Sequence, residues 1–367
     1  MPGAEGLEPS ADADAWLRLS LTPKLGPSAQ RKLLQVFGTP REVLEAAPGD
    51  IARAAGERAA AALRAGPDPD EVRRSIDWLH EPGNRLLTLG DQHYPRTLLE
   101  IADPPLVLFA KGRVELLNQP ALALVGSRSA TPRGIQDAES FAQALSNAGL
   151  SIVSGLALGI DSAAHRGGLS GASSSIAVVG TGLDKVYPAR NRALAHRLAE
   201  QGALVSEFAL GTPPLAANFP RRNRVISGLA RGCLVVEAAL RSGSLITARQ
   251  ALEQGREVFA IPGSIHSPLS KGCHWLIKQG AKLVETARDV LDELGMAQGP
   301  APADELQAPL QPLESEVLTS MGFEPVDADT IVHRTGLAAD AAAAILLKLE
   351  LDGYLARLPG GLLQRMR

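Results

Sequence analysis

The chain has 367 residues, of which 40 are acidic and 37 basic, and 45% are hydrophobic. This composition is typical of a water-soluble globular protein, and it excludes a disordered chain or a protein that is basic throughout, such as a histone-like coat. The length predicts two or three domains.

The sequence carries no sign of a membrane segment or of a disulfide framework. It contains no run of about 18 apolar residues, the length that a spanning helix needs. Residues 1–14 are acidic, whereas a signal peptide begins with basic residues. Cys233 and Cys273 are too few for a disulfide framework or a zinc site. We therefore expect a cytoplasmic protein without a membrane partner.

Two stretches rich in proline divide the chain into domains. Residues 65–70 hold two Pro and one Gly, and residues 297–312 hold four Pro without a periodic apolar pattern. We predict a helical domain over 1–80, an extended Rossmann-like domain over 81–296, a linker over 297–312 and a winged-helix domain over 313–367.

The first domain is predicted to consist of helices joined by tight turns. Apolar residues from Trp16 to Leu21 end at Pro23, and a second apolar pattern from Leu33 to Phe37 ends at Gly38. The pattern is similar to a helix-hairpin-helix or SAM-like domain, whose turn can present N–H groups to a phosphate. Residues 1–80 hold 10 basic and 12 acidic side chains. A protein-contact or packing role therefore stays open beside DNA binding.

In the middle of the chain, short apolar runs alternate with helical patterns. The runs are 121–125, 152–153, 176–179, 204–205, 234–236 and 258–261. Continuous apolar strands that alternate with helices indicate a parallel sheet covered on both faces. We predict an α/β fold with a Rossmann-like, doubly wound parallel sheet. Such sheets bind ligands at the carboxyl ends of their strands.

The last domain is predicted to contain three helices followed by two short strands, the order of a winged helix. Its third helix carries Asp340, Glu350 and Asp352 against Lys348 alone. This charge would repel a DNA major groove, so a regulator that reads duplex DNA is disfavoured. We expect a protein-contact domain.

Small residues follow five of the predicted strands. The segments are Gly126-Ser127-Arg128, Ser154-Gly155 leading to Asp161, Gly180-Thr181-Gly182, Ser242-Gly243-Ser244 with Thr247, and Pro262-Gly263-Ser264. Glycine lets a backbone approach an anion, and helix N-termini supply N–H donors. The spacing is neither that of a dinucleotide loop nor that of a Walker loop. The five segments together predict one shared anion site, although each alone is also compatible with an ordinary turn.

The sequence Phe219-Pro220-Arg221-Arg222-Asn223-Arg224 is the strongest single motif. Residues 219–256 contain seven Arg and two Glu. Arginine suits bidentate contacts to phosphate, and Phe219 offers a face to an unpaired base. Because 29 of the 37 basic residues are Arg, a salt-bridged helix start with a core Phe is the alternative. The interpretation requires that the guanidinium groups share one face and are free of carboxylates.

Catalytic motifs are scarce. The sequence has no Gly-x-Ser-x-Gly elbow and no His or Cys pair at metal-ligand spacing. Asp161 and His165 are four residues apart, and we favour a helix cap with a packed imidazole over an acid/base pair. We expect no catalytic residue, no metal and no cofactor.

In combination, these motifs resemble the DNA-processing protein A family, also called DprA or Smf. The matching motifs cover residues 90–295 in the order of the family, from Tyr94-Pro95 and Asp103-Pro104-Pro105 to Pro262-Gly263 and Leu276-Ile277. The resemblance implies a protein that binds single-stranded DNA, cooperates with single-strand-binding protein and loads RecA recombinase. It also implies homologous recombination, protection of incoming DNA in natural transformation (competence), and a homodimer formed through the Rossmann domain.

The resemblance also assigns roles to individual residues. Arg128 is the arginine of a Gly-Ser-Arg motif, and Phe219, Arg222, Asn223 and Arg224 belong to a Phe-Pro-x-Arg-Asn-Arg motif. His274 stands where the family commonly has Asn, which leaves a hydrogen bond there in doubt. The predicted DNA site comprises Gly126, Ser127, Arg128, Ser154, Gly155, Phe219, Arg221, Arg222, Asn223, Arg224, Ser242, Gly243, Ser244 and Thr247.

An enzymatic alternative stays open. The fold also resembles the cytokinin-activating phosphoribohydrolases, which act on nucleotide monophosphates. That group carries a Pro-Gly-Gly-x-Gly-Thr loop with a nearby catalytic Glu, and this loop is missing from the sequence. Glu237 is the one acid that we consider well placed. We therefore favour a non-enzymatic DNA-binding mediator over a phosphoribohydrolase-like enzyme.

Overall fold

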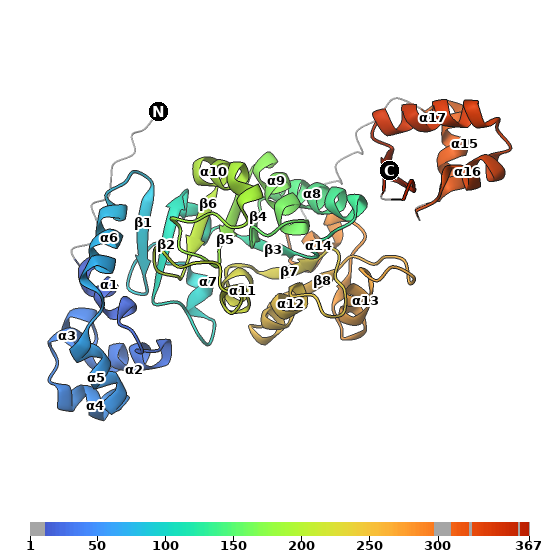
Figure 1. Cartoon of the computed structure of the whole chain (residues 1–367). Helices are drawn as coiled ribbons and strands as arrows, with labels where there is room; N and C mark the ends of the chain where they lie inside the picture. The colour runs from blue at the N-terminus through green and yellow to red at the C-terminus, as the bar shows by residue number, and fades with distance from the viewer. Residues whose placement is uncertain (1–11, 297–309, 323–324, 359, 367) are drawn as a thin grey trace.

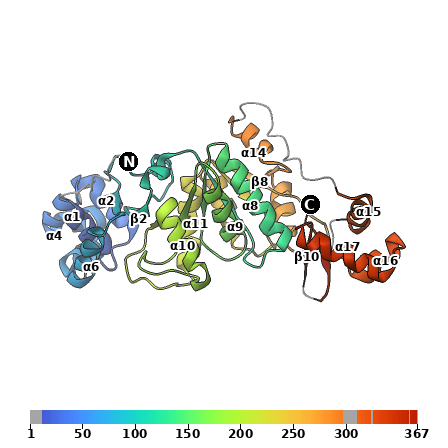
Figure 2. The same ribbon diagram turned by 90° about the horizontal axis from the view of Figure 1, so that it is seen from above.

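The computed structural model describes residues 12–296, 310–322, 325–358 and 360–366. The helical part, the sheet and the C-terminal part follow one another along the molecule (Figures 1 and 2). Most of the predicted linker, residues 297–309, lies outside the described residues, as does Pro359 of the predicted strand turn.

The N-terminal domain is a bundle of short helices around an apolar core that includes Leu17, Leu19 and Leu33. The helices are α1 (Ala13–Leu21), α2 (Pro27–Phe37), α3 (Pro40–Glu45), α4 (Pro48–Ala55), α5 (Glu57–Ala65) and α6 (Pro69–Leu79). The proline-rich stretch at 65–70 is the link between α5 and α6, and α6 packs back against α1, so this stretch lies inside the domain. The same core continues into Val107 and Phe109 of the neighbouring sheet.

A nine-stranded sheet forms the centre of the molecule. Its strands are β1 (Asn84–Thr88), β2 (Val107–Gly112), β3 (Ala121–Val125), β4 (Ser151–Ser154), β5 (Ser175–Val178), β6 (Ala203–Ser206), β7 (Gly232–Val235), β8 (Glu257–Ala260) and β9 (Lys282–Leu283). Their order is β1-β2-β6-β5-β4-β3-β7-β8-β9. The pairs from β6 to β9 are parallel, whereas β1 and β2 add antiparallel strands at one edge.

Helices cover both faces of the sheet, which confirms the doubly wound α/β prediction. In Figure 1, α8, α9 and α10 lie above the sheet and α11, α12 and α13 below it. The elements of this layer are α7 (Arg96–Leu99), α8 (Pro132–Asn147), α9 (Ile160–Ser170), α10 (Arg192–Gln201), α11 (Asn218–Leu229), α12 (Ser244–Glu253), α13 (Lys271–Lys278) and α14 (Ala287–Glu293), with 3-10 turns η1 (Val114–Asn118) and η2 (Ala189–Asn191). Each face has its own apolar core, one around Val225 and Leu245 and the other around Leu145 and Ala163.

The strand order reverses beside β3. From β3 the chain winds through β4, β5 and β6 in one direction, and it then crosses to β7 and continues to β8 and β9. Ala123 pairs with Val153 of β4 on one side and with Cys233 of β7 on the other. A crevice forms at such a switch point because the helices after β3 and β7 lie on opposite faces.

The C-terminal domain has the predicted winged-helix order. It contains α15 (Pro312–Met321), α16 (Ala328–Thr335) and α17 (Ala339–Leu351), followed by the antiparallel strands β10 (Leu355–Arg357) and β11 (Leu363–Arg365). Its core includes Leu318, Ile331 and Leu349. Within the described ranges no single helix is long and apolar enough to cross a membrane; α16 and α17 meet that test only together, with a bend of 115° between them.

A close backbone crossing fixes the loop between β4 and α9. Gly159 has φ +75° and ψ −124°, and the N–H of Ile160 donates to the carbonyl of Ser127 at 3.1 Å. A Cβ atom on Gly159 would lie 2.3 Å from that same carbonyl oxygen. The loops after β3 and β4 can therefore touch only if this residue is glycine.

We expect Gly159→Ala to lower stability much more than Gly149→Ala. Gly149 also has a positive φ, but a Cβ there would meet nothing within 4 Å. The Gly149 variant should lose about 1 kcal/mol for the left-handed backbone. The Gly159 variant should lose about 3 kcal/mol, because the overlap with Ser127 adds to the strain. Urea unfolding of both variants measures the difference, and equal midpoints would contradict the crossing.

Candidate nucleic-acid interface

A cavity of about 700 Å³ opens at the switch point, at the carboxyl ends of β3, β4 and β7. The segments that follow β3 and β7 and the first turns of α11 and α12 supply most of its lining. The predicted site residues that border it are Gly126, Ser127, Arg128, Phe219, Arg222, Asn223, Ser242, Gly243, Ser244 and Thr247. The structure therefore brings ten of the fourteen predicted residues to one cavity.

Arg128 and two aromatic rings form one wall of the cavity. The Arg128 guanidinium lies over the Phe219 ring, 5.5 Å from the ring centroid. The Tyr187 ring lies 5.7 Å from the Phe219 ring at an angle of 40°. Arg128 is exposed, and no carboxylate pairs with it among the residues that the structure describes. A cation beside exposed aromatic faces is the combination that binds a phosphate and an adjacent base.

The opposite wall is the N-terminal end of α12. Ser242, Gly243, Ser244 and Thr247 line the cavity there, and the Ser242 and Ser244 hydroxyls lie 2.7 Å apart. The first N–H groups of this helix already have acceptors: that of Ser244 donates to the Ser242 hydroxyl at 3.4 Å, and that of Leu245 to the Ser242 carbonyl at 3.2 Å. What favours an anion at this wall is the positive end of the helix dipole together with the two serine hydroxyls.

Arg222 borders the cavity but is only 4% exposed. Its guanidinium donates to the carbonyl of Gly155 at 2.8 Å and to that of Val178, so it joins the ends of β4 and β5. Its Nε donates to the Asn223 side chain at 3.2 Å. Burial lowers the pKa of Arg222 to about 10, so the group is still protonated at pH 7. Arg222 therefore contributes a fixed internal charge, and its Nε and Nη1 donors already have acceptors.

Asp161 lies beside Arg222 and also lines the cavity. Its Oδ2 accepts from the N–H groups of Gly155 and Ala157 at 3.1 and 3.3 Å. Burial raises the pKa of Asp161, and the Arg222 guanidinium opposes this rise. A Cβ on Gly155 would lie within 2.7 Å of both side chains, which explains the glycine. Asp161 thus holds the loop between β4 and α9 through its carboxylate. It is not the cap of α9 that the sequence suggested, because the N-cap residue of this helix is Gly159.

His165 is a packed core residue, as favoured from the sequence. Burial lowers the pKa of its imidazole to about 3, so the ring is neutral at pH 7. One ring nitrogen lies 2.8 Å from the Ser175 hydroxyl, and the other accepts from the N–H of Leu156 at 3.2 Å.

Arg221 and Arg224 do not border the cavity. Arg224 pairs with Glu207 at 2.7 Å and with Asp103 at 3.2 Å, and its side chain is 11% exposed. Arg221 reaches the same Glu207 at 3.3 Å and lies over the Phe208 ring. Arg221 and Arg224 therefore converge on one carboxylate, whereas Arg222 points to the cavity floor. For these two, the alternative of a salt-bridged helix start describes the geometry.

The shared anion site is smaller than predicted. Ser154 is fully buried and donates to the carbonyl of Leu124 at 2.7 Å, and it lies with Gly155 beneath the cavity. Among the lining residues we find none of the small residues after β5 and β8, because Gly180 lies under the Phe219 ring and Gly263 contacts His274. The expectation of five contributing strand ends was therefore wrong for β5 and β8, which lie farther from the switch point.

The sequence interpretation missed two lining residues of functional interest, Arg241 and Tyr187. Arg241 is exposed and, in the part of the chain that is described, has no carboxylate partner. The available signal was its position directly before Ser242-Gly243-Ser244. Tyr187 precedes Pro188 after β5, and only its place in the fold shows that its ring meets Phe219.

Glu237, the acid of the enzymatic alternative, lies behind the cavity wall. Its two carboxylate oxygens accept from the N–H of Thr131 at 2.9 Å and from the Thr131 hydroxyl at 2.6 Å. Its carboxylate is also so close to Gly134 that a Cβ there would lie 2.4 Å from it. Burial raises the pKa of Glu237, and the Thr131 hydrogen bonds oppose this rise. Glu237 thus fastens the loop that carries Arg128 to β7.

We expect Arg222→Met to lower the free energy of unfolding by about 3 kcal/mol, because it leaves two carbonyls and Asp161 buried without their partner. The matched substitution Arg221→Met, at the neighbouring half-exposed residue, should cost about 1 kcal/mol or less. Urea unfolding followed by circular dichroism compares the two variants. Equal losses would show that the burial of Arg222 does not matter.

Comparison with known proteins supports one family. The family model of DNA recombination-mediator protein A matches residues 85–295, a DprA-like N-terminal HHH domain matches 10–73 and a DprA winged helix domain matches 300–361. Protein Smf of Escherichia coli is 46% identical over 304 residues, covering 81% of each chain. DNA processing protein DprA of Streptococcus pneumoniae is 48% identical over 224 residues, covering 61% of this chain and 78% of that protein.

Two solved structures share the fold. The crystal structure of DprA from Streptococcus pneumoniae matches with a TM-score of 0.69 and 41% identity, covering 77% of this chain and 97% of that one. DNA processing protein A from Helicobacter pylori, solved for insight into its single-stranded DNA binding mode, matches with a TM-score of 0.52 and 29% identity, covering 57% and 95%. The chain therefore belongs to the DNA recombination-mediator protein A family, known as DprA or Smf.

Proposed function

We propose that the protein binds single-stranded DNA in the cavity at the switch point and acts as a recombination mediator. The observation that carries this proposal is the Arg128 guanidinium, which lies over the Phe219 ring without a carboxylate partner among the described residues, opposite the N-terminal end of α12. A phosphate can lie between Arg128 and the helix end while its base meets an aromatic face. Arg241 adds a second unpaired guanidinium at the same cavity.

The aromatic wall favours a single strand over a duplex. Phe219 and Tyr187 can meet the face of a base only where that base is unstacked and unpaired. A duplex offers its phosphates but keeps its base faces covered. We therefore expect weaker binding to duplex DNA.

The cavity predicts little sequence preference. Its polar lining consists mainly of hydroxyl groups, backbone and arginine, with Asn223 and Asp161 beside them, and phosphate contacts carry no base information. Aromatic residues make up only 4% of the chain, too few for a long stacking track. Affinity should rest mainly on phosphates and should fall steeply with salt.

The family supports the finer part of the proposal. A recombination mediator must deliver its strand to a recombinase, so we propose RecA as a partner, with single-strand-binding protein as the competitor on the strand. We also propose a homodimer through the Rossmann-like domain and protection of incoming DNA in natural transformation. The helical domain and the winged-helix domain, whose third helix is acidic, are proposed to contact protein.

The phosphoribohydrolase alternative receives less support. Glu237 is engaged with Thr131 and lies behind the wall, and Asp161 already accepts two backbone N–H groups. Incubation of the protein with nucleotide monophosphates tests this alternative. Release of free base above the level of an Arg128→Ala variant would favour the enzyme.

We expect Arg128→Ala to weaken binding to labelled oligo-dT by about tenfold, because it removes a charge-assisted phosphate contact. The slope of log Kd against log salt should fall by about 0.7, the value for one phosphate on a single strand. The control is Arg58→Ala, which removes an exposed charge on α5. Fluorescence anisotropy at several salt concentrations measures both quantities. Unchanged affinity and slope would remove Arg128 from the interface.

We expect Phe219→Leu to weaken binding by about tenfold through loss of base stacking, with an unchanged salt slope. Gly180 packs against the Phe219 ring so closely that a Cβ atom on it would lie 3.0 Å from a ring carbon. Leucine keeps an apolar side chain at this contact. The same anisotropy titration measures this variant. A salt slope reduced as in Arg128→Ala would show that Phe219 acts only by positioning Arg128.

A further inference from the structure

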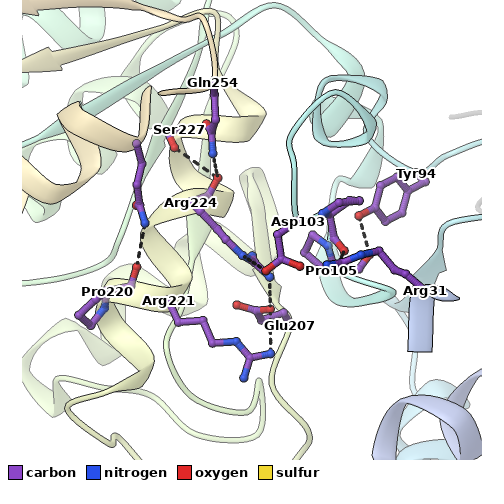
Figure 3. A network of polar contacts seen from close by, with 12 residues as sticks. Arg31, Tyr94, Asp103, Pro105, Glu207, Pro220, Arg221, Arg224, Ser227 and Gln254 are labelled. Atoms are coloured by element: carbon purple, nitrogen blue, oxygen red, sulfur yellow. Dashed lines mark hydrogen bonds and ion pairs between the residues drawn. The ribbon is translucent and has the colours of Figure 1, made fainter. Parts of the chain in front are cut away.

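The motif Asp103-Pro104-Pro105 does not line the cavity, yet it is at the centre of a chain of ion pairs. Arg31 of α2 pairs with Asp103 Oδ1, and Asp103 Oδ2 accepts from Arg224 Nε at 3.2 Å. Arg224 Nη2 donates to Glu207 Oε2 at 2.7 Å, and Arg221 reaches the same oxygen at 3.3 Å. Figure 3 shows these side chains in one row that runs from the N-terminal domain to α11.

The chain of ion pairs is partly shielded from water. The Glu207 and Arg224 side chains are 4% and 11% exposed, while the outer members, Asp103 and Arg31, are 43% and 24% exposed. Glu207 Oε1 and Arg224 Nη1 are buried without a hydrogen-bond partner. Removing Arg224 would therefore leave Glu207 buried with only the longer contact to Arg221, which is more costly than losing a surface ion pair. Removing Arg31 or Asp103 leaves each neighbouring charge one partner but breaks the connection between the helical domain and α11.

Other contacts hold the same segment in place. Arg31 also reaches the carbonyl of Pro104 at 3.5 Å, and the Tyr94 hydroxyl donates to the carbonyl of Pro105 at 2.7 Å. The core of the helical domain includes Leu106 of this segment and Leu210 of the loop after β6. The helical domain is thus fastened to the segment by packing as well as by charge.

The helix at the other end of the chain carries one wall of the cavity. Residues three or four apart lie on the same face of a helix. Phe219, Arg222, Asn223 and Ile226 of α11 line the cavity, whereas Arg221 and Arg224 lie on a different face and reach Glu207. A shift of α11 toward or away from Asp103 would therefore move the Phe219 ring relative to Arg128.

We propose that the N-terminal helical domain positions α11, and with it the Phe219 wall, through an ion-pair chain in which Asp103 is the central positioning residue. The proposal rests on the proposed function only for its effect on DNA. Asp103 touches neither the cavity nor any residue that binds the strand directly. Its carboxylate acts by joining Arg31 and Arg224, which lie 193 positions apart in the sequence.

The test uses the full-length chain with Arg31→Gln and Asp103→Asn. The controls are Arg53→Gln and Asp50→Asn, which break an exposed ion pair inside the helical domain. Amide hydrogen exchange of α11 peptides is compared among the variants without DNA. We expect several-fold faster exchange in α11 for Arg31→Gln and Asp103→Asn, although the α11 sequence is unchanged, and wild-type exchange for both controls. Unchanged exchange in the two test variants would overturn the coupling.

Binding to labelled oligo-dT supplies the second readout. Asp103→Asn should bind about tenfold more weakly, and the double variant with Arg31→Gln should bind no more weakly than Asp103→Asn alone, because the two residues act through one contact. The salt slope should stay at the wild-type value, since no phosphate contact is lost. Additive losses or a reduced slope would overturn the positioning role. If the wild-type chain does not bind the oligonucleotide, the proposed function fails, whereas the exchange result still decides the coupling.

Discussion

The cavity depends on one buried cation. Arg222 lies almost out of contact with water, where an isolated charge is very unfavourable, and it is stabilised there by two strand-end carbonyls and by the adjacent Asp161. This arrangement fastens β4 to β5 at their carboxyl ends and fixes the loop that starts at Gly155. The switch point can then remain open as a cavity because its floor is held by polar contacts that do not need a ligand.

The arginines around the cavity have different roles. Arg222 organises the floor, Arg224 and Arg221 are paired with Glu207, and Arg128 and Arg241 have no carboxylate partner among the described residues. Of these five arginines, only Arg128 and Arg241 can exchange bound water for a phosphate without first losing a partner inside the protein. The residues that hold the fold and the residues that meet the ligand therefore share a motif but not a role.

Much of this architecture could be predicted from the sequence. The parallel strands were predicted from continuous apolar runs. The glycines predicted to line the strand ends are explained by close contacts in the structure, such as that of Gly126 with Ile160. The antiparallel β1 and the short β9 lack such runs and were missed; β2 has one at 107–110, which was not assigned to a strand. The arginines could not be told apart, because a charge count over residues 219–256 omits Asp103 and Glu207, the carboxylates that neutralise part of the excess.

This neutralisation shapes how a polyanion can approach the protein. The net charge of −3 gives no general attraction, and the excess of arginine after Phe219 is partly neutralised by Asp103, Glu207 and Glu100. The attraction is therefore local, arising from two arginines and a helix end around one cavity. A ligand held by so few contacts is sensitive to their spacing, since a small shift of one wall weakens each contact. The ion pairs that fix α11 are for this reason as important to the interface as the groups that touch the strand.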